Sequence, residues 1–249
     1  MYPKYIFLLV FLASSSHFAF GQISDSVAPE EQLKTYTVFD LANIQNTNPI
    51  SISIRAIDMS YEGVKGSPYY NEDFETATLL IRNGEDLVRT EGLVQLDIYK
   101  HELWVQLSNT GEVVAITPDQ ILSCTFNKSQ KVFQVFESEL LGEGSESKFF
   151  AEVLLKEEFV LLKLRDKSFR KADYSGAYGN TGARYDKFIL KEQYYLAELG
   201  GAFQKIKLQK KSIEKALPNF KPALRDYFTD HKAIKTESEL LSLLNEIRN

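Results

Sequence analysis

The feature that most constrains the fold is a series of short strand-like segments across residues 50–209. The segment 50–57 (ISISIRAI) alternates between apolar and polar residues, which is the pattern of a half-buried strand. Turn signals such as Gly200-Gly201 separate the segments at intervals of about 8–12 residues, a spacing typical of antiparallel β-structure. We therefore expect residues 50–209 to form an antiparallel β-meander, either a single sheet or an incomplete barrel.

The apolar period changes in the tail, residues 210–249. Ser212 precedes a short helical run, and Pro218 interrupts this run where a second helix would begin. Thr236 and Glu239 have the spacing of a capping box at the start of a further helix. An apolar stripe follows, made by Leu240, Leu243, Leu244 and Ile247. Helices this short need a surface to dock on, so the sequence predicts an α+β fold with two or three short C-terminal helices packed on the β-domain.

Residues 1–21 have the pattern of a secretory signal peptide. Lys4 supplies a positive charge before the apolar run 5–13, and the small residues Ala19 and Gly21 mark a cleavage point. The apolar run is shorter than the roughly 20 residues of a membrane-spanning helix, so no membrane span is expected. The sequence thus predicts export to the periplasm, the cell surface or the extracellular space.

The chain contains one cysteine, Cys124, which cannot form an internal disulfide. It lies in the apolar segment ILSCTF without a basic neighbour in sequence that would lower the pKa of its thiol. We therefore expect a small buried side chain at this position, and a fold that depends on its hydrophobic core.

The charge is divided unevenly along the chain. Residues 22–159, which begin with a polar segment at 22–49, contain 10 Lys and Arg against 23 Asp and Glu. Residues 160–249 contain 18 Lys and Arg against 11 Asp and Glu. Attraction between the two halves explains this division better than an anionic partner does. The basic half also lacks the aromatic and basic pattern of nucleic-acid binding, so no nucleic-acid partner is expected.

The residues that usually carry catalysis or bind metals are scarce. His101, expected as a solvated residue of a hairpin turn, and His231, at a helix end, are the two histidines after the signal peptide. They are too few for a zinc site and badly placed for a catalytic triad. The acidic cluster Glu72, Asp73 and Glu75 lacks the spacing of a calcium loop. We assign no catalytic residue, no metal ligand and no cofactor.

The stretch 166–188 contains three glycines, Gly176, Gly179 and Gly182, in the pattern GxxGxxG. A phosphate-binding loop requires a different spacing and a following helix, whereas here a strand-like segment follows. A long connection between two strands is the better interpretation, and such loops often carry recognition residues. The candidate ligand-binding residues on and beside this loop are Tyr174, Tyr178, Arg184 and Tyr185.

A second candidate surface lies on the strand-like segment 159–169. Lys163, Arg165 and Lys167 alternate with apolar residues, and Lys205 and Lys207 could extend the cationic face that they form. Such a face would suit an anionic glycan or a lipid headgroup. The simpler interpretation is an edge or outer strand that its lysines keep soluble. Lys163 and Arg165 complete the candidate ligand-binding set.

Several segments resemble a family of exported, functionally uncharacterised proteins from Bacteroidota. They include KGSPYYNEDF (65–74), with the G-S-P-Y motif of the family, and GLVQLDIYKHELWV (92–105). Val94, Gln95 and Leu96 depart from the family pattern, which has Leu, Arg and Tyr there. The resemblance continues through 149–174, 187–196 and 210–232, and so covers most of the chain after the signal peptide. It implies export and a coherent fold, and it carries over no catalytic residue.

The sequence therefore favours an exported, non-enzymatic protein of the cell envelope that binds an unknown protein or glycan. One alternative is a hydrolase of envelope glycans, which needs two carboxylates roughly 5–9.5 Å apart across a cleft. Another is a structural component of an envelope complex, which would expose a large apolar patch. The sequence does not indicate an oligomeric state.

Overall fold

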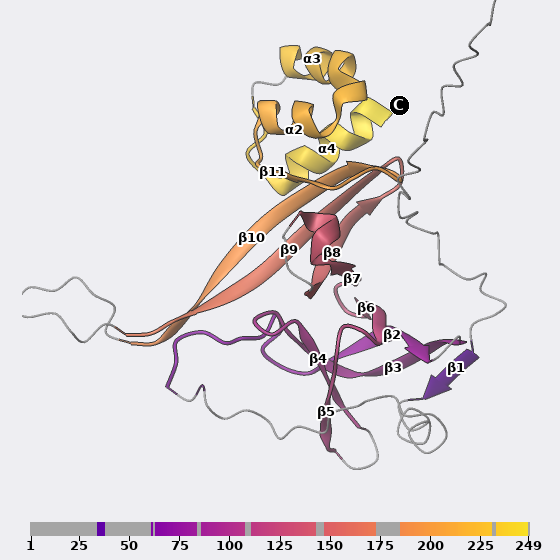
Figure 1. The fold of residues 1–249 in the computed structure, drawn as a ribbon, viewed down its shortest axis with the longest axis vertical. Helices are drawn as coiled ribbons and strands as arrows, with labels where there is room; N and C mark the ends of the chain where they lie inside the picture. Colours follow the sequence, from indigo (N-terminus) through magenta and orange to yellow (C-terminus); the bar gives the residue numbers. More distant parts are fainter. Residues whose placement is uncertain are drawn as a thin grey trace, which may run out of the picture.

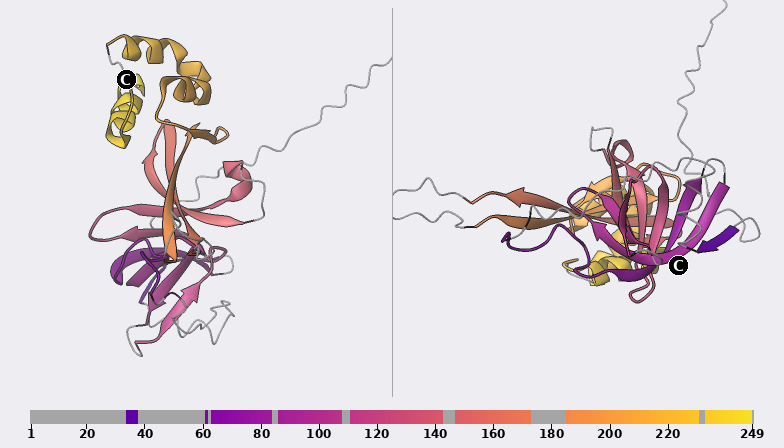
Figure 2. Two further views of the ribbon diagram at one scale, coloured as in Figure 1. Left: turned by 90° about the vertical axis from the view of Figure 1, so that its left-hand side faces the viewer. Right: turned by 90° about the horizontal axis from the view of Figure 1, so that it is seen from below.

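The computed structural model describes residues 34–37, 61, 63–83, 86–107, 111–142, 147–172, 185–230 and 233–248. Strands come first along the chain and helices last, which confirms the predicted α+β class. Figures 1 and 2 show an elongated molecule with the helices at one end of the sheet and the strands β2 to β5 at the other. The expected signal peptide at 1–21 and the strand-like segment 50–57 lie outside the described residues.

One open sheet contains every described strand. Its order is β11-β10-β9-β8-β7-β6-β2-β3-β4-β5, and β1 pairs in parallel with β3 beside this path. All other strand pairs are antiparallel. The strands are β1 (Lys34–Thr37), β2 (Glu75–Asn83), β3 (Asp86–Asp97), β4 (Glu102–Gln106), β5 (Val113–Ile116), β6 (Ile121–Phe126), β7 (Val132–Glu137), β8 (Lys148–Lys156), β9 (Phe159–Arg170), β10 (Lys187–Glu198) and β11 (Gln204–Ile206).

The half of the sheet from β2 to β6 is strongly curled. β6 pairs with β2, so β5 and β6 are separated by four strand spacings, which is about 19 Å in a flat sheet. Only residues 117–120 connect them, and these form a turn in which the N–H of Gln120 donates to the carbonyl of Thr117 at 3.2 Å. A turn this short cannot span the flat distance, so the sheet bends until β5 approaches β6. The predicted meander is thus one open sheet whose half from β2 to β6 is curled.

The curled half encloses a core that we call the β-core. Its buried side chains come from strands β2 to β8 and from Ile98, just after β3, and most of them alternate along their strand, as the period of two requires. Cys124 is buried, as expected, and Trp104 is also buried but lies outside this cluster. The β-core consists of Ala77, Leu79, Ile81, Val88, Val94, Leu96, Ile98, Leu103, Val105, Val114, Ile116, Ile121, Cys124, Phe126, Phe133 and Phe150.

The G-S-P-Y segment is a structural element that closes the end of the β3–β4 hairpin. The N–H of Tyr70 donates to the carbonyl of Leu96 at 2.7 Å, and the N–H of Ile98 donates to the carbonyl of Pro68 at 3.1 Å. The buried side chain of Asn71 continues this pairing, since it accepts the N–H of Leu96 at 3.0 Å and donates to the carbonyl of Val94 at 3.0 Å. The segment thereby satisfies main-chain groups that burial would otherwise leave without partners.

The tail forms the helices α2 (Lys210–Ala216), α3 (Lys221–Asp230) and α4 (Glu237–Arg248), with a short 3-10 turn η4 (Pro218–Phe220) between the first two. The predicted capping box is present: the N–H of Glu239 donates to Thr236 Oγ1 at 3.2 Å, and the N–H of Thr236 donates to the Glu239 carboxylate at 2.9 Å. Leu240, Leu243 and Leu244 are buried, as the stripe predicted.

The helices cover one face of β9 and β10 through a second core, which we call the helix–sheet core. Phe159 and Leu161 of β9 and Leu196 of β10 contribute from the sheet, and all three helices contribute from the tail. On the opposite face, a small cluster around Leu162 and Tyr195 packs against Leu141 of the 3-10 helix η3 (Ser138–Leu141). At this end of the sheet, β9 and β10 therefore bury apolar side chains on both faces. Within the described residues, no helix is long and apolar enough to cross a membrane.

The burial of Cys124 predicts how its thiol reacts. Burial raises the pKa of this thiol to about 12, so the reactive thiolate is almost absent in the folded protein near neutral pH. We expect iodoacetamide to leave Cys124 unmodified in the native protein and to modify it across the urea unfolding transition. Mass spectrometry of samples labelled along a urea series measures this. Complete labelling in native buffer at the rate of a model thiol peptide would contradict the predicted burial.

Candidate functional site

Lys163 and Arg165 do not form the solvated cationic face expected from the sequence. Strand β9 lies between β8 and β10, and is neither an edge strand nor an outer strand. The side chains point into the molecule, and Lys163 is 8% exposed and Arg165 9% exposed. The alternation of lysines with apolar residues predicts a solvated face, because the sequence does not show which acidic residues the neighbouring elements bring to β9.

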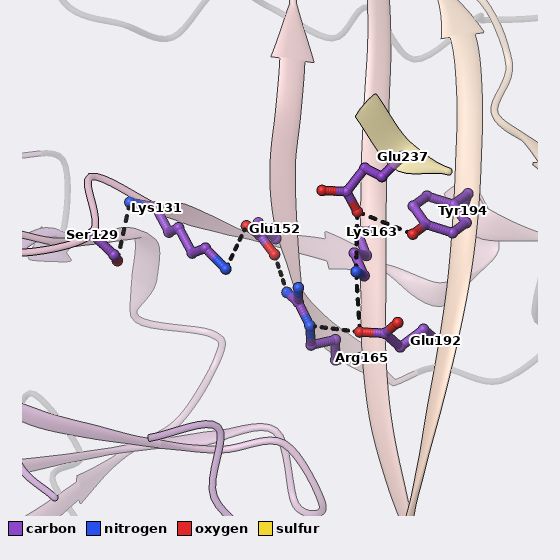
Figure 3. A network of polar contacts seen from close by, with 8 residues as sticks. All are labelled: Ser129, Lys131, Glu152, Lys163, Arg165, Glu192, Tyr194 and Glu237. Carbon is purple, nitrogen blue, oxygen red and sulfur yellow. Dashed lines mark hydrogen bonds and ion pairs between the residues drawn. The ribbon is translucent and has the colours of Figure 1, made fainter. Parts of the chain in front are cut away.

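The two cations belong to a chain of alternating charges that we call the ionic seam, shown in Figure 3. The Arg165 guanidinium pairs with the Glu152 carboxylate of β8, and its Nε donates to Glu192 Oε1 of β10 at 3.0 Å. Lys163 Nζ lies 3.1 Å from Glu192 Oε1 and 3.0 Å from Glu237 Oε2. The seam consists of Lys131, Glu152, Arg165, Glu192, Lys163 and Glu237, together with Tyr194.

Both ends of the ionic seam are anchored on other elements. Lys131, just before β7, places its Nζ 3.4 Å from Glu152 Oε1. At the other end, Tyr194 donates its hydroxyl to Glu237 Oε2 at 3.0 Å, and Glu237 is the first residue of α4. A carboxylate in the first turn of a helix also interacts favourably with the helix dipole. The seam therefore ties the last helix to the centre of the sheet.

The ionic seam lies between the two hydrophobic cores, on one face of the sheet. Along β8, Glu152 stands between Phe150 of the β-core and Leu154, which packs against the helix–sheet core. Along β9, Lys163 follows Leu161 of the helix–sheet core on the same face. The charges thus separate the curled half of the sheet from the helical half.

The pKa shifts of Arg165, Lys163 and Glu237 favour the charged form of each side chain in the folded protein. Burial lowers the pKa of Arg165 and of Lys163, but hydrogen bonds to their carboxylate partners outweigh it, and both values lie above the ordinary range. Burial raises the pKa of Glu237, but hydrogen bonds from Lys163 and Tyr194 outweigh it, and the value lies below the ordinary range. The hydrogen bonds of the seam therefore outweigh burial at each of these three side chains.

His101 is buried, which corrects the expectation of a solvated turn residue. It is 5% exposed and has a left-handed backbone conformation with φ of 53°. Its Nδ1 accepts the N–H of Phe150 at 3.3 Å, and its Nε2 lies 4.0 Å from Asp166 Oδ1. Burial lowers the pKa of His101 to about 4, so the ring is neutral at neutral pH and its proton is on Nε2.

A pocket of about 550 Å³ opens where the chain after β11 diverges from β10. Tyr194, Ile206 and Leu208 supply its apolar surface, and Glu192, Gln193, Lys205, Lys207 and Ser212 supply its polar groups. This volume lies in the range of small-molecule sites. The structure therefore gathers Lys205 and Lys207 around a concavity, and Glu192 and Tyr194 belong to both the pocket and the ionic seam.

The residues proposed from the sequence do not form one site. Tyr174, Tyr178 and Arg184 lie outside the described residues. Tyr185 is exposed, and the Lys65 ammonium lies 3.6 Å from the centre of its ring. In the sheet, Lys163 lies opposite Tyr194, which is nine residues further along the chain than Tyr185. The candidates Lys163 and Tyr185 are therefore about 30 Å apart along the strand.

Sequence reasoning missed the contribution of β10 to the pocket and to the seam. One signal was available: the alternation in KFILKEQYY places Phe188, Leu190, Glu192 and Tyr194 on one face of a strand. That Glu192 would meet Arg165 and Lys163 depends on the register between β9 and β10, which alternation alone does not fix.

Comparisons with known proteins add no assignment. No protein-family profile, no curated protein and no solved structure matches this chain. In the part of the chain that the structure describes, no group of three or more His, Cys, Asp or Glu side chains could hold a metal ion. The chemistry of the candidate site must therefore be argued from its own residues.

The burial of Glu152 and Arg165 predicts a large effect of breaking their pair. We expect Arg165→Met to lower the free energy of unfolding by about 3–5 kcal/mol, because it leaves the Glu152 carboxylate buried without its guanidinium. The double variant Glu152→Met/Arg165→Met should lower the free energy of unfolding by less than Arg165→Met does, because it does not leave the Glu152 carboxylate buried without its partner. Urea denaturation measures the three free energies.

The matched control for this pair is Lys148→Met. Lys148 lies 2.9 Å from Asp119 in a more exposed ion pair, so its loss should change the free energy of unfolding by about 1 kcal/mol or less. If Arg165→Met costs no more than Lys148→Met, the ionic seam does not stabilise the fold as argued.

The lowered pKa of His101 predicts a loss of stability in acid. In the unfolded chain the imidazole titrates near its ordinary value of 6.5, and in the folded protein near 4. The unfolded state therefore binds the proton first as the pH falls. The stability that the neutral, buried imidazole contributes is fully present above about pH 6.5 and is lost as the pH falls to about 4. The loss amounts to about 3 kcal/mol.

The variant His101→Asn isolates this contribution, because Asn accepts the left-handed backbone and does not titrate. The difference in unfolding free energy between native protein and variant should shrink by about 3 kcal/mol between pH 7 and pH 4. Urea melts at both pH values measure it. A difference that does not depend on pH would show that His101 titrates normally in the folded state.

Proposed function

We propose that the protein is an exported binding protein of the cell envelope that holds an anionic group in the pocket between β10 and β11. The observation that carries this proposal is the position of Lys205 and Lys207 at a pocket of about 550 Å³. Both lysines are exposed, so their ammonium groups lie at the surface within reach of a ligand. Tyr194, Ile206 and Leu208 offer apolar contact to the rest of the ligand.

The pocket favours binding over hydrolysis. The only carboxylate in its lining is Glu192, and this group already interacts with Lys163 at 3.1 Å and with Arg165 at 3.0 Å. Hydrolysis of a glycoside usually requires two carboxylates, one of which keeps its proton as a general acid. The described lining offers no second carboxylate, and Glu192 is already held between Lys163 and Arg165.

The described surface also gives little support to a purely structural partner. The large apolar side chains that are exposed in the described ranges lie on different elements: Leu93, Leu140, Tyr185, Leu190 and Leu199. A structural interface would gather such residues into one patch. The export of the protein is supported by the signal-like residues 1–21 and by the resemblance to exported proteins of Bacteroidota.

The proposal predicts stabilisation by an anionic ligand that depends on two lysines. The melting temperature should rise with at least one member of a panel made of an acidic oligosaccharide of uronic acids, a glycerophosphate and an acidic peptide. At a concentration of 100 times Kd the stabilisation is about 2.7 kcal/mol, or several degrees for a domain of this size. The rise should vanish in the double variant Lys205→Gln/Lys207→Gln, which removes both ammonium groups.

The matched control is Lys211→Gln, which removes the charge of an exposed lysine of α2 that does not line the pocket. It should keep the full shift of the melting temperature. A panel without any shift, or a shift that survives in Lys205→Gln/Lys207→Gln, would overturn the proposed anionic site.

A further inference from the structure

Strand β10 pairs unequally on its two sides. Its inner side pairs with β9 over all twelve residues, Lys187–Glu198. On its outer side, β11 covers only Tyr194–Leu196. Near the other end, the main chain of Lys65 pairs with Asp186 and Phe188 at 2.9 and 3.0 Å. Between these contacts, no described strand pairs with the outer side of β10 over residues 189–193.

The main-chain groups of this opening point outward. The N–H of Phe188 donates to Lys65 on the outer side, and Tyr194 lies opposite Ile206 of β11 on that same side. Because the direction of main-chain hydrogen bonds alternates along a strand, Leu190 and Glu192 also direct their N–H and C=O groups outward. The opening is therefore a template of about 16 Å for one more strand.

The two faces beside the opening differ in chemistry. Odd-numbered residues of β10 share one face, and Lys205 lies opposite Tyr195 on that face. This face carries Lys187 and Lys191 of β10 and Lys205 of β11, with Ile189 and Gln193 between them on β10. Even-numbered residues share the other face, where Phe188 is half-buried, Leu190 is 50% exposed and Glu192 is held by Lys163 and Arg165. A strand added at the centre of the opening would place alternate side chains over Lys191 and over Leu190.

We propose that the ligand of the pocket is an extended peptide segment of another protein, which adds to the outer side of β10 between residues 189 and 193. Its side chains alternate between Asp or Glu, over the lysine face, and apolar residues, over Leu190. One end of the segment enters the pocket beside Lys205 and Lys207. This inference rests on the proposed function, since it names the class of ligand for the same pocket, and it corresponds to β-strand addition.

A second copy of this chain fits the opening less well. Two copies of β10 that paired antiparallel about the centre of the opening would place Lys191 directly opposite its own counterpart. Like charges directly opposite one another destabilise a strand pair. The lysine face of each copy would also meet the lysine face of the other. The charges of the edge therefore select an acidic strand over the chain itself.

The probe is a fluorescein-labelled, acetylated heptapeptide of alternating glutamate and valine, measured by fluorescence anisotropy with the full chain. We expect saturable binding, and no binding of the same peptide with lysine in place of glutamate. Two further peptides carry N-methyl groups, one on its valines and one on its glutamates. One of the two should lose binding at least tenfold, because it lacks the donors that face β10, and the other should bind as the parent does.

The protein variants test the same edge. Leu190→Pro removes the outward N–H without removing a hydrogen bond to β9, and it should weaken binding at least tenfold. Leu190→Ala is the matched control, which keeps that donor and should bind the peptide within a few-fold of the native protein. Amide hydrogen exchange gives a second readout that needs no variant: the peptide should slow exchange at Leu190 and Glu192 in the native protein.

The outcomes separate this inference from the proposed function. If both N-methylated peptides bind as the parent does, or if exchange at Leu190 and Glu192 is unchanged, strand addition is wrong. If the uronate or the glycerophosphate binds through Lys205 and Lys207 and the peptide does not, the anionic pocket stands and the peptide ligand is wrong. If sedimentation shows a dimer that protects the same amides, the occupant is a second copy. If no anionic probe binds, both proposals fail.

Discussion

The arrangement of the molecule depends on the burial of Lys163 and Arg165 in the middle of β9. Two cations can stay in this position only because β8, β10 and α4 each bring a glutamate to them. The need to pair these cations fixes the register of β8, β9 and β10 together, because a slip of one residue would turn a carboxylate to the opposite face of the sheet. The ionic seam therefore specifies how the curled half of the sheet and the helical half meet, which two apolar cores in contact would leave less defined.

Much of the fold could be predicted from the sequence because local chemistry determines it. The capping box at Thr236 and Glu239, the stripe of α4 and the turn at Gly200, where φ is 77°, act within a few residues. The return of β6 to pair with β2 was not predicted. It depends on how the curled sheet buries its core, and no short segment contains that information.

The site was predicted less well, for a related reason. A lysine that alternates with apolar residues has the same sequence pattern on a solvated edge and beside buried carboxylates. What distinguishes the two is the neighbour in the sheet, and Glu152 lies 13 residues from Arg165 whereas Glu192 lies 27 residues away. The division of charge along the chain accounts for only part of the seam: Glu152 of the acidic half pairs with Arg165 of the basic half, but Glu192 and Glu237 both belong to the basic half.

The ionic seam also bears on where the proposed anionic ligand would bind. Glu192 and Tyr194 line the pocket, but their polar atoms already interact with Arg165, Lys163 or Glu237. A ligand that competed for them would have to break contacts that hold α4 on the sheet. Lys205 and Lys207 stand outside the seam and reach the pocket from the short strand β11 and the residue after it. The proposed anionic ligand would therefore bind on the outer side of the sheet, where the main-chain groups of Leu190 and Glu192 also point.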